Sequence, residues 1–333
     1  MTPKRLFFIL TSCWTITALS SAALVFAVWN TSTPGVADAV AGVSTTSLTP
    51  DPTPSLAPYP VFNAPANPDI LAKEYTLYNP NSGKTLLASS TMSPVPIAST
   101  TKLMTVYLVA SADTAELDTY FTITQAAVDQ PTDASVMGLV IGEKITMRSL
   151  LYGTLLVSGG DAAYMLAEIR GGELLGDPNA TSQQKITRFL QAMNTEAAAL
   201  HMDHTHYTDP TGYDATTMST ADDLAKIMYL DSQNSTLQGI IHTSDITVTS
   251  EDGYTSHVLH NSNRLLADAA YPGMIGGKTG FTDEAGHCLT AVATRNGITL
   301  VVVILNTSYD TADASADEAR KLLDIGFNNL TLE

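Results

Sequence analysis

The chain has 333 residues, with 33 acidic residues against 16 Lys and Arg and a formal net charge of −17. This excess of negative charge argues against binding to nucleic acid and against adhesion to anionic lipid. The two cysteines, Cys13 and Cys288, lie in distant and dissimilar segments, so we expect no disulfide framework. We expect Cys288 to be a small core residue, because it sits in an alternating, strand-like run.

The first thirty residues have the pattern of a targeting segment. Lys4 and Arg5 precede residues 6–29, which carry no charge and are long enough to cross a bilayer. The positive flank predicts that the N-terminus stays in the cytoplasm and that the rest is exported. We therefore expect residues 1–30 to be a transmembrane anchor. The alternative is a signal peptide cleaved near the small-residue sequence VFA, which would release the chain to the cell wall.

Residues 31–68 are rich in Ser, Thr, Pro and Ala, with almost no charge and no apolar period. This composition predicts a linker, which in an extended form would reach on the order of 100 Å. A linker of that reach would lift the following domain, residues 69–333, away from the membrane surface.

The pattern within residues 69–333 predicts a sheet built from both ends of the domain. Residues 73–89 alternate like a hairpin, and residues 100–230 are mostly helical. Strand patterns follow residue 240, and Asn296-Gly297 between two apolar runs indicates a second hairpin. An amphipathic helix ends the chain. The expected fold class is α/β in the broad sense and α+β more narrowly: an antiparallel sheet flanked by helices, a mainly helical second lobe, and a cleft between them.

The stretch PIASTTKLMTVYLVA, residues 96–110, places Ser99 and Lys102 on one face of an apolar helix. Burial disfavours the charged form of a lysine and lowers its pKa, so Lys102 can accept a proton near neutral pH. Ser99 lies one turn earlier, which makes the pair a nucleophile with its own base. The simpler interpretation is a surface serine and a lysine that snorkels out of a core helix.

Two further motifs follow along the chain. Ser158-Gly159-Gly160 joins two helical stretches, where Asp161 is expected to cap the second helix and the Ser158 hydroxyl is expected to be exposed. GGKTGFT, residues 276–282, is a strand weakened by glycines, which suggests a ligand backbone lying along it. An ordinary helix–helix turn and a glycine-rich loop are the simpler interpretations.

Ser-x-x-Lys, Ser-Gly-x and Lys-Thr-Gly, in this order on one domain, resemble the signature set of penicillin-binding proteins and serine β-lactamases. Over roughly residues 70–330 the chain is similar to the D-alanyl-D-alanine carboxypeptidase family, the low-molecular-mass penicillin-binding proteins. The segments that carry this resemblance are LYNPNSGKTLLASSTMSPVPIASTTKLMT, HTHYTDPTGYDATTMSTADDLAKIM, HNSNRLL and GMIGGKTGFTDEAGHCLTAVATRNGITLVVVILN. The resemblance implies a β-lactamase/transpeptidase-like fold and a serine peptidase that needs no cofactor and no metal.

The resemblance also implies roles for residues. Ser99 attacks the carbonyl between two D-alanines of a peptidoglycan stem peptide, and Lys102 takes its proton. The backbone N–H groups of Ser99 and Phe281, which follows Gly280, form the oxyanion hole. A β-lactam would acylate Ser99 by the same route.

The second and third motifs have implied roles as well. Ser158 and Lys278 relay a proton to the departing D-alanine amine. Thr279 binds the terminal carboxylate with help from Arg264. Independently of the resemblance, attachment to the cytoplasmic membrane is expected through residues 1–30.

The middle motif departs from the family pattern, which usually ends in Asn where this chain has Gly160. Loss of the amide would remove one polar contact to substrate, worth about 1–3 kcal/mol. This departure keeps open a weakened module that binds penicillin or the cell wall without turnover.

A serine β-lactamase is the other alternative, and it needs a general base for deacylation. Glu168 and Glu173 follow Ser158 too closely to supply one. The sequence does not separate carboxypeptidase from endopeptidase, since the chemistry is identical.

Histidines 201, 204 and 206 have a spacing compatible with zinc ligands. We expect no metal, because the segment lies where the family has a loop leading to Pro-Thr-Gly. We also expect four methionines to fill the core, namely Met104, Met147, Met165 and Met193.

Overall fold

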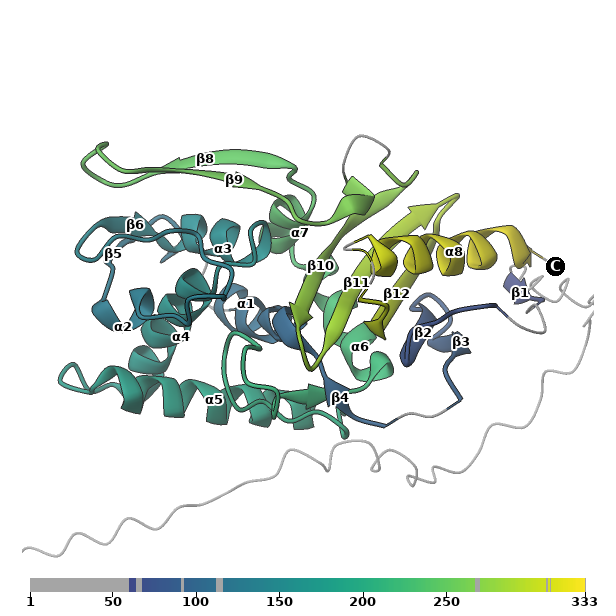
Figure 1. Ribbon diagram of the computed structural model, residues 1–333, viewed down its shortest axis with the longest axis horizontal. Helices are drawn as coiled ribbons and strands as arrows, with labels where there is room; N and C mark the ends of the chain where they lie inside the picture. Colours follow the sequence, from purple (N-terminus) through teal and green to yellow (C-terminus); the bar gives the residue numbers. More distant parts are fainter. Residues whose placement is uncertain are drawn as a thin grey trace, which may run out of the picture. The chain divides into compact units, whose positions relative to one another are not determined.

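A computed structural model (Figure 1) describes residues 60–63, 68–90, 93–111, 116–266, 270–309, 311 and 313–332. The predicted anchor or signal peptide, residues 1–30, and most of the predicted linker, residues 31–68, lie outside the described residues. Within the described ranges, no helix is both long and apolar enough to span a bilayer.

The main sheet is built from both ends of the domain, as predicted. Its strand order is β10-β11-β12-β2-β3, and every neighbouring pair is antiparallel. The strands are β2 (Glu74–Asn79), β3 (Lys84–Ala88), β10 (Met274–Thr282), β11 (Gly286–Arg295) and β12 (Ile298–Thr307). β10 lies at one edge, so one side of this strand is free to face the cleft.

The turn between β11 and β12 follows from two residues. Asn296 and Gly297 have φ values of 51° and 77°, and Arg295 pairs with Ile298 across the turn. Positive φ at both central residues matches the twist of a hairpin, and Asn-Gly is the sequence that adopts it most easily. The predicted hairpin is confirmed.

Alternation along β12 creates two hydrophobic cores, one on each face of the sheet. Val301 and Val303 belong to the core that includes α6 (Ala221–Gln233) and the helical lobe. Val302 and Ile304 belong to the core on the opposite face, where α8 (Ala314–Asn329) packs. Successive side chains of a strand point to opposite faces, so this central strand is apolar on both.

The second lobe is mainly helical (Figure 1). Its helices are η1 (Ala98–Thr101), α1 (Lys102–Ala110), α2 (Gln125–Val128), α3 (Met147–Leu155), α4 (Gly160–Leu175), α5 (Ser182–Ala199) and α7 (Ser235–Ile241). α1 contacts α3, α4, α5, α6 and α7, which explains why its sequence is apolar almost all round. Met104, Met147, Met165 and Met193 are buried in this lobe, as predicted, and Cys288 is a buried core residue.

Shorter elements complete the described chain. They are β1 (Pro60–Phe62) paired with β13 (Leu330–Leu332), β4 (Val95–Pro96) with β7 (Met218–Ser219), β5 (Tyr120–Thr122) with β6 (Lys144–Thr146), β8 (Asp245–Thr249) with β9 (Ser256–His260), and the 3₁₀ helix η3 (Arg264–Leu266). β1 falls inside the range predicted as linker. A run of three residues has too little pattern to indicate a strand, and only pairing with the end of the chain produces it.

Candidate active site

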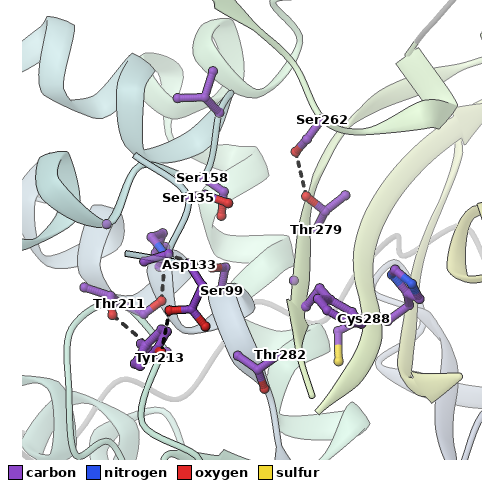
Figure 2. A pocket seen from close by; sticks show the side chains of 18 of the residues that line it. Ser99, Asp133, Ser135, Ser158, Thr211, Tyr213, Ser262, Thr279, Thr282 and Cys288 are labelled. Carbon is purple, nitrogen blue, oxygen red and sulfur yellow. Dashed lines mark hydrogen bonds between the residues drawn. The ribbon is translucent and has the colours of Figure 1, made fainter. Parts of the chain in front are cut away.

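A cleft of about 890 Å³ lies where the helical lobe meets the edge strand β10. Ser99, Lys102 and Ser158 line it from the helical lobe, and Thr279 to Thr282 line it from β10. Figure 2 shows Ser99, Ser158 and Thr211 on one side, with Thr279 and Ser262 on the other. The cleft therefore brings all three sequence motifs together.

Ser99 and Lys102 form the first hydroxyl–lysine pair. Ser99 lies on η1 and Lys102 is the first residue of α1, so a 3₁₀ turn rather than an α-helix connects them. Side chains at i and i+3 eclipse in a 3₁₀ turn, which aligns the two groups. The Lys102 Nζ atom donates to Ser99 Oγ at 2.8 Å and to the Thr211 carbonyl at 2.7 Å.

Lys102 is poised to act as a base. Its side chain is buried, with 2% of the residue exposed. Burial lowers the pKa of Lys102 to about 8, and the negative charges of Asp209 and Asp161 limit the decrease. A substantial fraction of Lys102 is therefore neutral at slightly alkaline pH, when it can take the Ser99 proton.

Backbone segments pack closely around the nucleophile Ser99. Ala98, just before Ser99, has a φ of 45°, a conformation that costs energy in a residue with a side chain. A Cβ atom at Gly212 would lie 1.8 Å from the Ala98 carbonyl oxygen, and one at Gly280 would lie 3.0 Å from the Ser99 nitrogen. Glycine at positions 212 and 280 thus lets a loop and strand β10 close on Ser99 from two directions.

Ser158 and Lys278 form the second pair. The Lys278 Nζ atom donates to Ser158 Oγ at 2.9 Å and to the Thr279 carbonyl at 2.7 Å. Burial lowers the pKa of Lys278 well below its usual value, and the positive charge of Lys102 lowers it further. Ser158 has a φ of 61°, so a tight turn before α4 directs this hydroxyl to the cleft. The expectation that the hydroxyl is exposed is wrong, because Ser158 is only 7% exposed and its hydroxyl packs against the buried Lys278.

The hydroxyl of Thr279 lies 2.6 Å from that of Ser262, and this pair faces the cleft (Figure 2). Arg264 also lines the cleft, where its Nε atom lies 3.1 Å from an Asp313 carboxylate oxygen. Sequence reasoning singled out Thr279 and Arg264 but missed Ser262. The quoted segment HNSNRLL contains this serine, but nothing in it indicates that the hydroxyl meets Thr279.

Gly160 is the first residue of α4, and its N–H donates to the Ser135 carbonyl at 2.7 Å. A Cβ atom there would lie 3.2 Å from Gln130 Oε1, so the side chain of Gln130 occupies the space beside this glycine. The expectation that Asp161 caps α4 is only partly right. Gly159 is the N-cap residue, but Asp161 accepts the Ala162 N–H in the first turn of α4 at 2.8 Å, and it also accepts backbone N–H groups from residues 137–139.

The mouth of the cleft carries side-chain contacts that the sequence motifs do not indicate. Phe281 is partly exposed, and its ring centroid lies 4.5 Å from that of His287. The Tyr213 hydroxyl donates to Asp133 at 2.7 Å, joining two loops that line the cleft. Tertiary packing alone brings these loops together, so no sequence signal could have found the contact.

Two acidic side chains considered above, Glu168 and Glu173, have structural partners. Glu168 accepts from Thr124 and Ser182, and Glu173 pairs with Arg170. In the part of the chain that the structure describes, no group of three or more His, Cys, Asp or Glu side chains has the arrangement of a metal site.

Comparison with known proteins identifies relatives of this arrangement. Residues 62–309 match the Peptidase S11 family, described as D-alanyl-D-alanine carboxypeptidase. A D-alanyl-D-alanine carboxypeptidase of Streptomyces sp. strain K15 is 33% identical over 274 residues, which cover 79% of this chain and 90% of the relative. A D-alanyl-D-alanine endopeptidase of Pseudomonas aeruginosa is 31% identical over 279 residues, covering 82% and 83%.

The fold has solved counterparts as well. The crystal structure of the Streptomyces K15 DD-transpeptidase superposes with a TM-score of 0.71 at 32% identity, covering 80% of this chain and 99% of that one. The antiparallel sheet with flanking helices and a helical second lobe is thus the α+β fold of the DD-peptidases, as predicted.

Proposed function

The chain belongs to the Peptidase S11 family of D-alanyl-D-alanine carboxypeptidases, and on that premise we propose that it removes the terminal D-alanine from peptidoglycan stem peptides through an acyl-enzyme on Ser99. One observation carries this proposal: a buried lysine with a lowered pKa lies 2.8 Å from the hydroxyl of a serine at the floor of a cleft. The family name supplies the substrate class, and the geometry supplies the residues.

Acylation begins with proton transfer from Ser99 Oγ to neutral Lys102. The Ser99 oxygen forms a bond to the carbonyl carbon between the two D-alanines. The backbone N–H groups of Ser99 and Phe281 stabilise the oxyanion, a role that suits the close approach of β10 at Gly280. Water later hydrolyses the ester and restores Ser99.

The leaving group needs a proton when its C–N bond breaks. Ser158 and Lys278 supply it, because Lys278 donates to Ser158 Oγ and the serine lies between that lysine and the cleft. The lowered pKa of Lys278 makes its ammonium a better acid than an exposed lysine.

The substrate carboxylate binds at the other end of the reacting bond. The paired hydroxyls of Thr279 and Ser262 can both turn toward it, since a hydroxyl hydrogen rotates to suit its acceptor. Arg264 contributes positive charge at this end, moderated by its ion pair with Asp313.

A β-lactamase needs a carboxylate that activates water for deacylation, and the two candidates from the sequence, Glu168 and Glu173, are bound to other side chains. This favours hydrolysis of a terminal D-alanine over β-lactamase activity. Glu168 is buried against Thr124 and Ser182, and Glu173 pairs with Arg170 on the same helix. Neither lines the cleft, so neither can activate water at an acyl group on Ser99. A β-lactam should therefore form a persistent adduct.

The test is an intact-mass time course of residues 60–333 mixed with benzylpenicillin, run beside Ser99→Ala. We expect a one-to-one adduct that persists for many minutes and is absent from the variant. Rapid loss of the adduct as penicillin is consumed would indicate a β-lactamase. Absence of any adduct would indicate a binding module, with Gly160 as the first suspect.

The same chemistry serves a carboxypeptidase and an endopeptidase, and one relative bears the endopeptidase name. A stem pentapeptide and a cross-linked dimer, supplied together, distinguish the two. We expect free D-alanine to appear first, with the dimer cut more slowly.

We also propose that residues 1–30 anchor the chain in the cytoplasmic membrane with the catalytic domain on its outer face, and that residues 31–59 act as a tether. The support is the charge-free segment 6–29 behind Lys4 and Arg5. Fractionation of cells that express the full chain tests this proposal. Recovery of the intact chain in the membrane fraction, open to external protease, is expected, whereas a shortened chain in the medium would indicate cleavage.

A further inference from the structure

A buried carboxylate directly behind the Ser158 turn has no place in the steps above. Asp161 lies in the first turn of α4 and is 2% exposed. Its Oδ1 atom accepts the N–H of Met137 at 2.7 Å and that of Ala162 on its own helix at 2.8 Å, and Oδ2 accepts those of Gly138 and Leu139, each at 2.9 Å. Three consecutive amides of one loop thus converge on a single side chain.

This loop forms part of the cleft. Asp133, Ala134 and Ser135 line the cleft just before the three amides that Asp161 binds. Ser135 returns the contact, since its carbonyl accepts the Gly160 N–H at 2.7 Å. Asp161 therefore fastens one wall of the cleft to the turn that carries Ser158.

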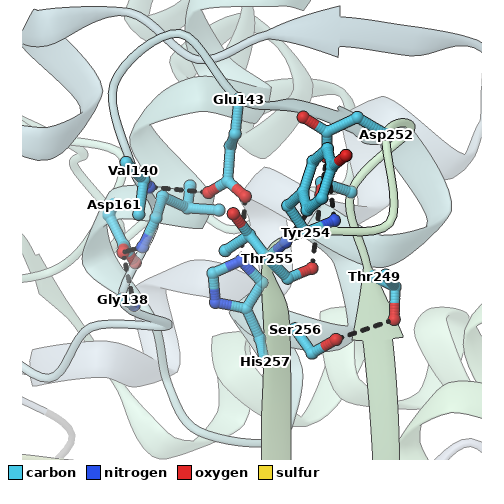
Figure 3. A network of polar contacts seen from close by, with 12 residues as sticks. Gly138, Val140, Glu143, Asp161, Thr249, Asp252, Tyr254, Thr255, Ser256 and His257 are labelled. Atoms are coloured by element: carbon cyan, nitrogen blue, oxygen red, sulfur yellow. Dashed lines mark hydrogen bonds and ion pairs between the residues drawn. The ribbon is translucent and has the colours of Figure 1, made fainter.

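The far end of the loop is held by a second buried carboxylate (Figure 3). Glu143 accepts the Val140 N–H at 2.6 Å and lies 3.1 Å from His257 Nε2 on β9. Both side chains of this pair are almost fully buried. Two buried carboxylates therefore hold the loop between Asp133 and Glu143, and Asp161 is the one that lies on the helix following the Ser158 turn.

We propose that Asp161 is a positioning residue, which fixes the cleft wall against the Ser158 turn and places a negative charge behind the Ser99–Lys102 pair. The inference rests on the proposed function, because it assigns an effect on the same acylation step.

The negative charge of Asp161 acts on Lys102. Asp209 in the loop before Thr211 and Asp161 on α4 both raise the pKa of Lys102, while burial lowers it. Lys278 on β10 is the second buried lysine whose charge interacts with that of Lys102. Further out, ionisable groups line the cleft mouth, namely Asp133, Arg264, His260, Asp283, Glu284 and His287.

Asp161→Asn removes the charge and part of the hydrogen bonding to the loop while it keeps the size of the side chain, so each effect needs its own readout. We expect the rate of penicillin acylation to fall by about tenfold, because the amide nitrogen cannot accept the N–H groups of the loop. In the wild type the acylation rate should rise with pH as Lys102 loses its proton, with a midpoint near pH 8. We expect this acid limb of the pH–rate profile to move toward lower pH by roughly half a unit in the variant. Loss of a negative neighbour favours neutral Lys102, which sets this sign.

Glu168→Gln is the matched control, since Glu168 is a buried carboxylate on the same helix whose partners lie outside the cleft. We expect its acid limb to match that of the wild type. An unmoved acid limb in Asp161→Asn, or an equal movement in Glu168→Gln, would overturn the inference. Failure of the wild type to acylate would instead overturn the proposed function.

Hydrogen exchange of the wild type decides the positioning role even where Asp161→Asn does not fold. The amides of Met137, Gly138 and Leu139 should exchange at least about 100-fold more slowly than unprotected amides, although they belong to no helix or strand. Exchange of all three at the rate of an unfolded chain would refute the proposal that Asp161 holds this loop.

Discussion

The cleft holds two hydroxyl–lysine pairs of nearly the same geometry but of different origin. Ser99 and Lys102 are three residues apart and 2.8 Å apart, whereas Ser158 and Lys278 are 120 residues apart and 2.9 Å apart. Both lysines are buried, and burial lowers the pKa of each. A local turn is enough to form the first pair, while the second requires strand β10 to dock against the helical lobe.

Because the two pairs form in different ways, different changes should disrupt them. A change that disturbs the docking of β10 disrupts the second pair and leaves the first intact. The first pair depends on its environment in another way, because Lys102 also donates to the Thr211 carbonyl from a distant loop. The docked strand and loop therefore turn a common local spacing into a reactive centre.

Breaking the local pair should have the largest effect. Lys102→Met removes the base and keeps an apolar side chain in a buried position. We expect the rate of penicillin acylation to fall by about 10³- to 10⁴-fold, the upper part of the range of a lost general base. Stopped-flow acylation measures the loss, with thermal unfolding as the check on folding. Activity within tenfold of the wild type would remove Lys102 from the mechanism.

Breaking the distant pair should cost less. Ser158→Ala leaves Lys278 in place but removes the hydroxyl that carries its proton to the leaving group. We expect kcat/KM for release of D-alanine from a stem pentapeptide to fall by about 10²-fold. Ser232→Ala is the control, since this buried serine donates to the Tyr229 carbonyl and lies outside the cleft. Equal losses in the two variants would point to general destabilisation.

Gly160 lies two residues after Ser158, so a side chain at this position tests the surroundings of the Ser158–Lys278 pair. Gly160→Asn requires Gln130 to move, because a Cβ atom would lie 3.2 Å from the end of that flexible side chain. We expect the variant to fold and to keep kcat/KM within about tenfold, the effect of one polar contact. Gly160→Asn combined with Gln130→Ala should be at least as active as Gly160→Asn alone. Collapse of both would mean that the site is built around a glycine.

A buried carboxyl group away from the cleft gives the smallest effect on activity. Asp231 on α6 is fully buried, neither carboxylate oxygen has a hydrogen-bond partner among the described residues, and burial raises its pKa well above the usual value. The folded state therefore holds a proton that the unfolded chain releases above about pH 4, so stability falls as pH rises.

Asp231→Asn removes this dependence. We expect the free energy of unfolding of the variant, relative to the wild type, to increase steadily from pH 4 to pH 8, with kcat/KM unchanged. Urea unfolding at several pH values measures it. A constant difference across the range would mean that Asp231 is not protonated in the fold.

Much of the site was predictable from the sequence because its chemistry depends on short motifs. The turn that holds Ser99 and Lys102, the glycine-lined strand around Lys278 and the Asn296-Gly297 hairpin each depend on local steric rules. The sheet built from both ends followed from strand patterns alone. The exact turn was not predictable, since the difference between a 3₁₀ turn and an α-helix at Ser99 depends on what packs there.

Tertiary structure decided the contacts between distant segments. Examples are the Thr211 carbonyl on Lys102, the hydroxyl of Ser262 on Thr279, and the loop amides of residues 137–139 on Asp161. A residue type and its local spacing determine which chemistry is available. Which groups meet depends on the packing of whole elements, because only the folded chain brings residues more than 100 positions apart within hydrogen-bond distance.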